Sequence, residues 1–173
     1  AGMTAADALA AGEAVNFVVP TGNFGNILAA YYAKELGVPV HKLICASNSN
    51  KVLFDFFQTG EYDRNRAFVL TTSPSMDILI SSNLERLIYH IAGDSAAADA
   101  GFMKQLSETG KYQITDSMRE KLADFASGWA TEEETAGEIR ERYEKDGYVI
   151  DPHTAVASAV YGKYRKETGD ETR

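Results

Sequence analysis

Apolar positions along the chain change their spacing several times, and each change predicts a different element. Residues 15–19 are a short run of β-branched and aromatic side chains closed by a proline, which is typical of a buried strand. Residues 25–36 carry apolar side chains at helical spacing and precede a glycine, so they predict a helix. A second strand is predicted over residues 41–47 and a second helix over residues 50–60. Alternation of strand and helix predicts a parallel sheet with flanking crossover helices, so the expected fold class is α/β.

The pattern changes in the middle of the chain. Residues 66–74 predict a third strand, and residues 81–93 predict a helix with Ser82 or Asn83 as its N-cap. Residues 94–125 are largely polar with helical spacing. They predict a helical excursion rather than further sheet.

The remaining elements are marked by capping residues. Thr131 and Glu134 form the S/T-x-x-E capping box of a helix, so the preceding residues 125–130 predict one more strand. Asp151 is the predicted N-cap of the closing helix, with a proline at the first helical position.

Composition narrows the classes of function. With 173 residues, 45% hydrophobic and 24% charged, the chain is expected to be one globular domain or one domain and part of another. The net charge of −8 argues against a nucleic-acid partner, because phosphate backbones are bound by clustered Lys and Arg. No apolar stretch approaches the roughly 20 residues that cross a bilayer, so no membrane partner is expected. The first residues lack the pattern of a signal peptide, and a single cysteine, Cys45, fits a reducing compartment, so the expected location is cytoplasmic.

The connection between the first strand and the first helix carries the first candidate site. It consists of Gly22, Asn23, Phe24, Gly25 and Asn26, hereafter the 22–26 loop. A helix N-terminus offers free N–H groups and a positive dipole end, glycines remove Cβ clashes, and the two asparagines can add side-chain donors. Neither the P-loop nor the dinucleotide fingerprint fits this spacing. Spacing alone therefore leaves two interpretations open, a plain turn and a phosphate site.

The start of the closing helix carries a second candidate, Thr154. Its hydroxyl lies in the first helical turn after Asp151, where the simplest interpretation is a helix cap with a spare hydroxyl. The three histidines are far apart, and no Cys or His spacing typical of a metal site occurs, so no metal is expected.

Three segments together resemble one enzyme family. Residues 16–39, 71–87 and 151–164, which include G-N-F-G-N and D-P-H-T-A-V, are closely similar to threonine synthase, a lyase that depends on pyridoxal 5'-phosphate (PLP). The resemblance implies the tryptophan-synthase-β-like fold (PLP fold type II) and makes residues 1–173 a partial PLP-binding large domain. It matches the 22–26 loop to the site of the PLP phosphate and Thr154 to the residue beside the pyridine nitrogen. A neutral hydroxyl there would not hold the nitrogen protonated.

The family reaction converts O-phospho-L-homoserine and water to L-threonine and phosphate, through β,γ-elimination and hydration. It is a step of threonine biosynthesis. The block of residues 71–87 matches a family signature, yet the sequence assigns no role to its Ser75, Asp77, Asn83 or Arg86.

One departure from the family concerns the lysine that carries PLP. In the family it stands in an S-F-K-D type segment, and no lysine here has that context; the lysines are Lys34, Lys42, Lys51, Lys104, Lys111, Lys121, Lys145, Lys163 and Lys166. The chain is therefore expected to be a C-terminal portion that lacks the PLP lysine and is inactive alone. Two alternatives remain: another enzyme of this PLP fold, such as a serine or threonine dehydratase, and a non-catalytic phosphate-binding module. Oligomeric state is not predicted.

Overall fold

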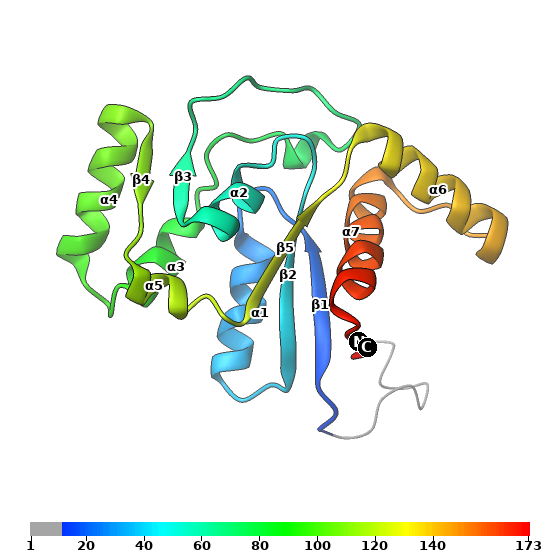
Figure 1. Cartoon of the computed structure of the whole chain (residues 1–173), viewed down its shortest axis with the longest axis horizontal. Coiled ribbons are helices and arrows are strands. Elements are labelled where there is room, and N and C mark those ends of the chain that lie inside the picture. The colour runs from blue at the N-terminus through cyan, green and yellow to red at the C-terminus, as the bar shows by residue number, and fades with distance from the viewer. Residues whose placement is uncertain (1–11) are drawn as a thin grey trace.

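A three-stranded parallel sheet lies at the centre of the computed structural model, which describes residues 12–173 (Figure 1). Its strands are β1 (Val15–Pro20), β2 (Val40–Ser47) and β5 (Phe125–Trp129), in the order β1-β2-β5. The middle strand, β2, pairs in parallel with both neighbours. The three predicted strands at these places and the α/β fold class are thus confirmed.

Helices cover both faces of this sheet. α1 (Gly25–Glu35) and α2 (Val52–Thr59) pack on one face, and α7 (Pro152–Thr168) packs on the other (Figure 1). Side chains of β2 alternate accordingly. Leu43 and Cys45 belong to the core with α1 and α2, whereas Ile44 and Ala46 belong to the core with α7. Burial on both faces explains why residues 43–46 of β2 are a continuous apolar run.

The two C-terminal helices begin at their predicted caps. Before α6 (Glu132–Asp146), the Thr131 hydroxyl accepts from the Glu134 N–H at 3.1 Å, and the Glu134 carboxylate accepts from the Thr131 N–H at 2.8 Å. Before α7, the Asp151 carboxylate accepts from the N–H groups of His153 and Thr154 at 2.9 and 3.2 Å. Both caps satisfy donors that a helix start leaves free.

The middle of the chain forms a smaller unit beside α1 and α2 (Figure 1). It contains α3 (Leu84–Ile91), α4 (Ala96–Thr109), α5 (Asp116–Glu120) and the antiparallel pair β3 (Glu61–Asp63) and β4 (Lys111–Gln113). The range 94–125, expected to be a helical excursion, contains α4 and α5 but also β4, which lies outside the main sheet. Among residues 12–173, every helix is too short or too polar to span a membrane.

The strand predicted at residues 66–74 is wrong. This segment is an extended loop that ends in a short 3-10 helix, Pro74–Met76, and Leu70 on it is 84% exposed. Several of its N–H groups bond to side chains rather than to a neighbouring strand. The Val69 N–H donates to Asn50 Oδ1 and the Thr71 N–H donates to Asp77 Oδ2, each at 2.9 Å.

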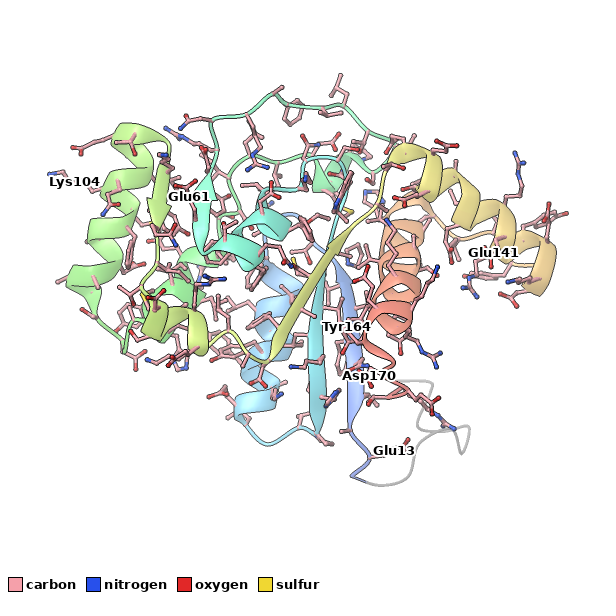
Figure 2. All side chains as sticks on the ribbon, viewed as in Figure 1. Glu13, Glu61, Lys104, Glu141, Tyr164 and Asp170 are labelled. Atoms are coloured by element: carbon pink, nitrogen blue, oxygen red, sulfur yellow. The ribbon has the colours of Figure 1, made fainter. Side chains whose placement is uncertain are left out.

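The C-terminal segment after α7 returns to the edge of β1. The Asn16 N–H donates to the carbonyl of Arg173, and Asn16 Nδ2 donates to Asp170 at 3.0 Å. The Tyr164 hydroxyl also donates to Asp170, at 2.7 Å, and Figure 2 labels both residues. This segment therefore occupies backbone and side-chain groups of an edge strand that would otherwise face solvent.

Candidate functional site

A pocket of about 260 Å³ lies at the C-terminal end of β1, where the chain turns into α1. It is lined by the whole 22–26 loop and by Val19, Pro20, Thr21, Ile27, Ser75, Met76 and Asn83. Open parallel sheets bind ligands at the C-terminal ends of their strands. The structure thus brings five of the six predicted site residues together in a place suited to a ligand.

Phe24 gives the 22–26 loop its shape. It is the N-cap of α1 and has φ 64°, in the left-handed region that a residue with a side chain rarely adopts. The residue is 1% exposed, and its ring packs against Phe57 and Phe125 with ring centroids 6.1 and 6.0 Å apart. Burial of the ring therefore holds the backbone in a conformation that it would otherwise disfavour.

The two glycines of the loop have different structural reasons. A Cβ on Gly22 would overlap the backbone oxygen of Ser75, so only glycine lets the 3-10 helix approach the loop. A Cβ on Gly25 would meet only Asn83 Nδ2, at an ordinary 3.5 Å. Gly22 is thus required by packing against the protein, whereas Gly25 leaves space on the pocket side.

Four residues that line this space carry backbone N–H groups without a partner in the described chain. Within residues 12–173, the N–H groups of residues 23–26 have no hydrogen-bond acceptor in the protein, and the cap of α1 makes no side-chain bond. These groups stand at the positive end of an 11-residue helix. None of the side chains lining the pocket is charged. The arrangement suits an anion that is bound by main-chain N–H groups.

The side chains of Asn23 and Asn26 are exposed at the rim of the loop. Neither side chain makes a hydrogen bond within the described chain, so both amides are available to a ligand.

Thr154 does not line the pocket. It is exposed in the first turn of α7, and its hydroxyl donates to the Asp151 carboxylate. This bond is the main cause that lowers the pKa of Asp151 to about 2, with smaller contributions from the N–H groups of Thr154 and His153. As the structure stands, the Thr154 hydroxyl completes a helix cap.

His153 connects the start of α7 to the pocket wall. Its Nε2 accepts from the Ser75 N–H at 3.4 Å, and its Nδ1 lies 3.2 Å from Asp151 Oδ1. Because Nε2 accepts, the Nδ1–H tautomer of a neutral ring fits both contacts. The α7 start and the 22–26 loop thus flank the same 3-10 helix.

Ser81, which the sequence did not indicate as a site residue, bonds to the 22–26 loop without lining the pocket. Its hydroxyl donates to the Gly22 carbonyl at 2.7 Å, across 59 positions of the chain. No local pattern could reveal a contact of this separation. Among residues 12–173, no group of three or more His, Cys, Asp or Glu side chains could hold a metal ion.

Comparison with known proteins places this geometry in a family context. No protein-family model matches the sequence. Human threonine synthase-like 1 is 46% identical over 159 residues, which are 91% of this chain and 21% of that protein. Threonine synthase of Saccharomyces cerevisiae is 43% identical over 156 residues, which are 82% of this chain and 30% of that protein.

Solved structures agree with these relatives. PLP-bound threonine synthase from Brucella melitensis superposes with a TM-score of 0.85 at 42% identity, over 91% of this chain and 33% of that one. Yeast threonine synthase superposes with a TM-score of 0.84 at 39% identity, over 91% of this chain and 34% of that one. The predicted PLP fold type II is therefore confirmed for the part of the fold that this chain spans. By sequence and by fold, the chain is similar to the threonine synthases, and it spans about a third of their length.

Proposed function

We propose that this chain supplies the phosphate-binding part of a PLP site in a threonine synthase. The proposal rests on the N–H groups of residues 23–26. These groups have no acceptor within the described chain, and their residues line a pocket at the start of α1. The likeness to a PLP-bound threonine synthase supports PLP as the source of the phosphate.

The residues present fit a phosphate group better than a whole cofactor. Several convergent N–H donors and a helix N-terminus suit a dianion with three acceptor oxygens. The pocket of about 260 Å³ is smaller than the roughly 300–1,000 Å³ typical of sites for drug-sized ligands. The ring of PLP would therefore need walls beyond those of this pocket.

Bound PLP would supply an electron sink for proton removal from an amino-acid substrate. The 22–26 loop would hold the phosphate, and the buried Phe24 ring would keep the loop in its shape. The Thr154 hydroxyl is proposed to lie beside the pyridine nitrogen. The hydroxyl would then have to turn away from Asp151, its present acceptor. Its neutral character would leave that nitrogen unprotonated.

The proposed reaction converts O-phospho-L-homoserine and water to L-threonine and phosphate. None of the lysines in the sequence lines the pocket. We therefore propose that the lysine carrying PLP is supplied by residues outside this sequence, and that the 173-residue chain alone forms no threonine. A cytoplasmic location is part of the same proposal.

Two alternatives use the same loop. A dehydratase of this PLP fold would hold the phosphate identically but would deaminate serine or threonine. A non-catalytic module would bind phosphate without any turnover. Product identity separates the three.

A chimera tests the proposal. Residues 12–173 replace the matching segment of yeast threonine synthase, and phosphate release from O-phospho-L-homoserine is measured together with the absorbance of bound PLP. We expect both signals, and their loss in a folded chimera that carries Gly25→Asp. A folded, PLP-loaded chimera that deaminates serine or threonine but releases no phosphate would favour the dehydratase. A chimera that binds phosphate but not PLP would favour the binding module.

A further inference from the structure

Two carbonyl groups of the 22–26 loop are held by side chains of one short segment. The Ser81 hydroxyl donates to the Gly22 carbonyl at 2.7 Å. The Asn23 carbonyl accepts twice from Asn83, from its backbone N–H at 3.1 Å and from its Nδ2 at 2.8 Å.

Each of these donors is itself held in place. The Ser81 N–H donates to the Tyr62 hydroxyl at 2.8 Å, and that hydroxyl donates to the Leu79 carbonyl at 3.0 Å. Ser81 is 5% exposed and Tyr62 is 1% exposed. Arg86 donates to Asn83 Oδ1, which turns the Nδ2 of the same amide toward the loop. The holding groups are therefore fixed independently of any ligand.

The geometry of the trans peptide determines where these bonds direct the N–H groups of the loop. The C=O of one residue and the N–H of the next lie in one plane and point in opposite directions within it. Fixing the Gly22 carbonyl on Ser81 directs the Asn23 N–H to the other side, and fixing the Asn23 carbonyl on Asn83 does the same for the Phe24 N–H. These are two of the N–H groups that have no acceptor within the described chain.

We propose that Ser81 and Asn83 are positioning residues for the anion site, because they bind the loop carbonyls and so direct the loop N–H groups toward the phosphate. This inference rests on the proposed function of the loop. It also gives roles to two signature residues that the sequence left unassigned: Asn83 orients the loop, and Arg86 orients Asn83. Ser81 is the more informative residue, because it does not line the pocket and cannot act by touching the ligand.

The test compares the adjacent serines in the 173-residue chain. Ser81→Ala removes the donor to Gly22, whereas Ser82→Ala changes an exposed hydroxyl for which no bond occurs within the described residues. Inorganic phosphate is titrated into the protein, and its affinity is measured by calorimetry. The amide resonances of residues 23 and 24 are followed by NMR in the ¹⁵N-labelled protein. We expect Ser81→Ala to weaken phosphate binding about tenfold and to shift the Asn23 amide. Ser82→Ala should do neither, and Ser81→Thr, which keeps the hydroxyl, should stay close to the unchanged chain.

The outcomes separate this inference from the proposed function. If Ser81→Ala lowers the melting temperature but leaves phosphate affinity and the Asn23 amide unchanged, Ser81 is merely structural and the inference fails. Equal effects of the two serine variants also overturn it. If the unchanged chain binds no phosphate, the proposed function fails and this inference fails with it, whereas phosphate binding that Ser81→Ala leaves unchanged overturns the inference alone. If Ser81→Ala does not fold, Asn83→Ala decides it through the Phe24 amide in the same way.

Discussion

Gly22 packs against the backbone oxygen of Ser75 so closely that a Cβ on residue 22 would overlap that atom. The contact joins the loop after β1 to the 3-10 helix Pro74–Met76, and both line the same pocket. Its geometry depends on the absence of one carbon atom, which makes it directly testable.

Gly22→Ala should destabilise the chain by about 1–3 kcal/mol, because the new methyl group overpacks a site that the backbone of Ser75 already fills. Urea unfolding at constant pH measures the difference in free energy. Gly25→Ala is the matched control: its Cβ meets only Asn83 Nδ2 at 3.5 Å, and alanine favours the helix by about 1 kcal/mol relative to glycine. Equal destabilisation by both substitutions would contradict the packing account.

We expect Asp77 to be the main hydrogen-bond acceptor that stabilises the loop before the 3-10 helix. Its carboxylate accepts from Asn48 at 2.8 Å, from Asn50 at 3.0 Å and from both the hydroxyl and the N–H of Thr71 at 2.7 and 2.9 Å. Asp77→Asn would turn an amide donor toward some of these donors, so we expect a loss of about 1–3 kcal/mol in unfolding free energy. Asp63→Asn, which changes an acceptor of one backbone bond, is the control. A loss at Asp77 no larger than at Asp63 would show that the cluster does not hold the loop.

The same carboxylate predicts a dependence of stability on pH. Burial raises the pKa of Asp77, but the hydrogen bonds from Thr71, Asn48 and Asn50 outweigh it, and the pKa lies below its ordinary value of 3.8. A lowered pKa in the folded state stabilises the protein above the ordinary pKa, and this contribution is lost as the pH falls through the folded value. Stability should therefore decline below about pH 4, and less steeply in Asp77→Asn. Parallel pH profiles for the two proteins would refute this cause.

Thr154 should control the acidity of Asp151. Because the Thr154 hydroxyl is the main cause that lowers the Asp151 pKa to about 2, Thr154→Val should bring that pKa back toward the ordinary 3.8. The carboxyl resonance of Asp151 in an NMR titration reports this value. Thr154→Ser keeps the hydroxyl and should retain the low pKa. An unchanged pKa in Thr154→Val would mean that the N–H groups of the helix start suffice.

Much of the fold could be predicted because its signals are local. β1 and α1 follow from one change of apolar spacing, and Thr131 and Glu134 mark the start of α6 by residue type alone. The strands β3 and β4 were missed because three residues each are too few to show an alternation. Residues 66–74 resemble a strand in composition, yet side chains such as Asn50 and Asp77 take the hydrogen bonds that a strand partner would make.

The candidate site was predictable in part for the same reason. The 22–26 loop stands between two strong local patterns, so its position at a helix N-terminus could be read directly. The left-handed backbone of Phe24 could not, because it depends on a pocket formed with Phe57 and Phe125. The contact of Ser81 with Gly22 likewise exists only in the folded chain.

Phosphate binding by Gly25→Asp tests the central claim most directly, because the substitution should separate binding from folding. A carboxylate in the first turn of α1 interacts favourably with the helix dipole and should stabilise the folded chain by about 0.3–1 kcal/mol. Gly25 has no positive φ that would oppose a side chain. The same carboxylate would occupy the place of the anion and repel it. Calorimetric titration with inorganic phosphate should therefore show binding to the unchanged chain and to Gly25→Ala, and none to Gly25→Asp, while Gly25→Asp unfolds at the same or a higher urea concentration. Undiminished phosphate binding by a folded Gly25→Asp chain would contradict an anion site at the 22–26 loop.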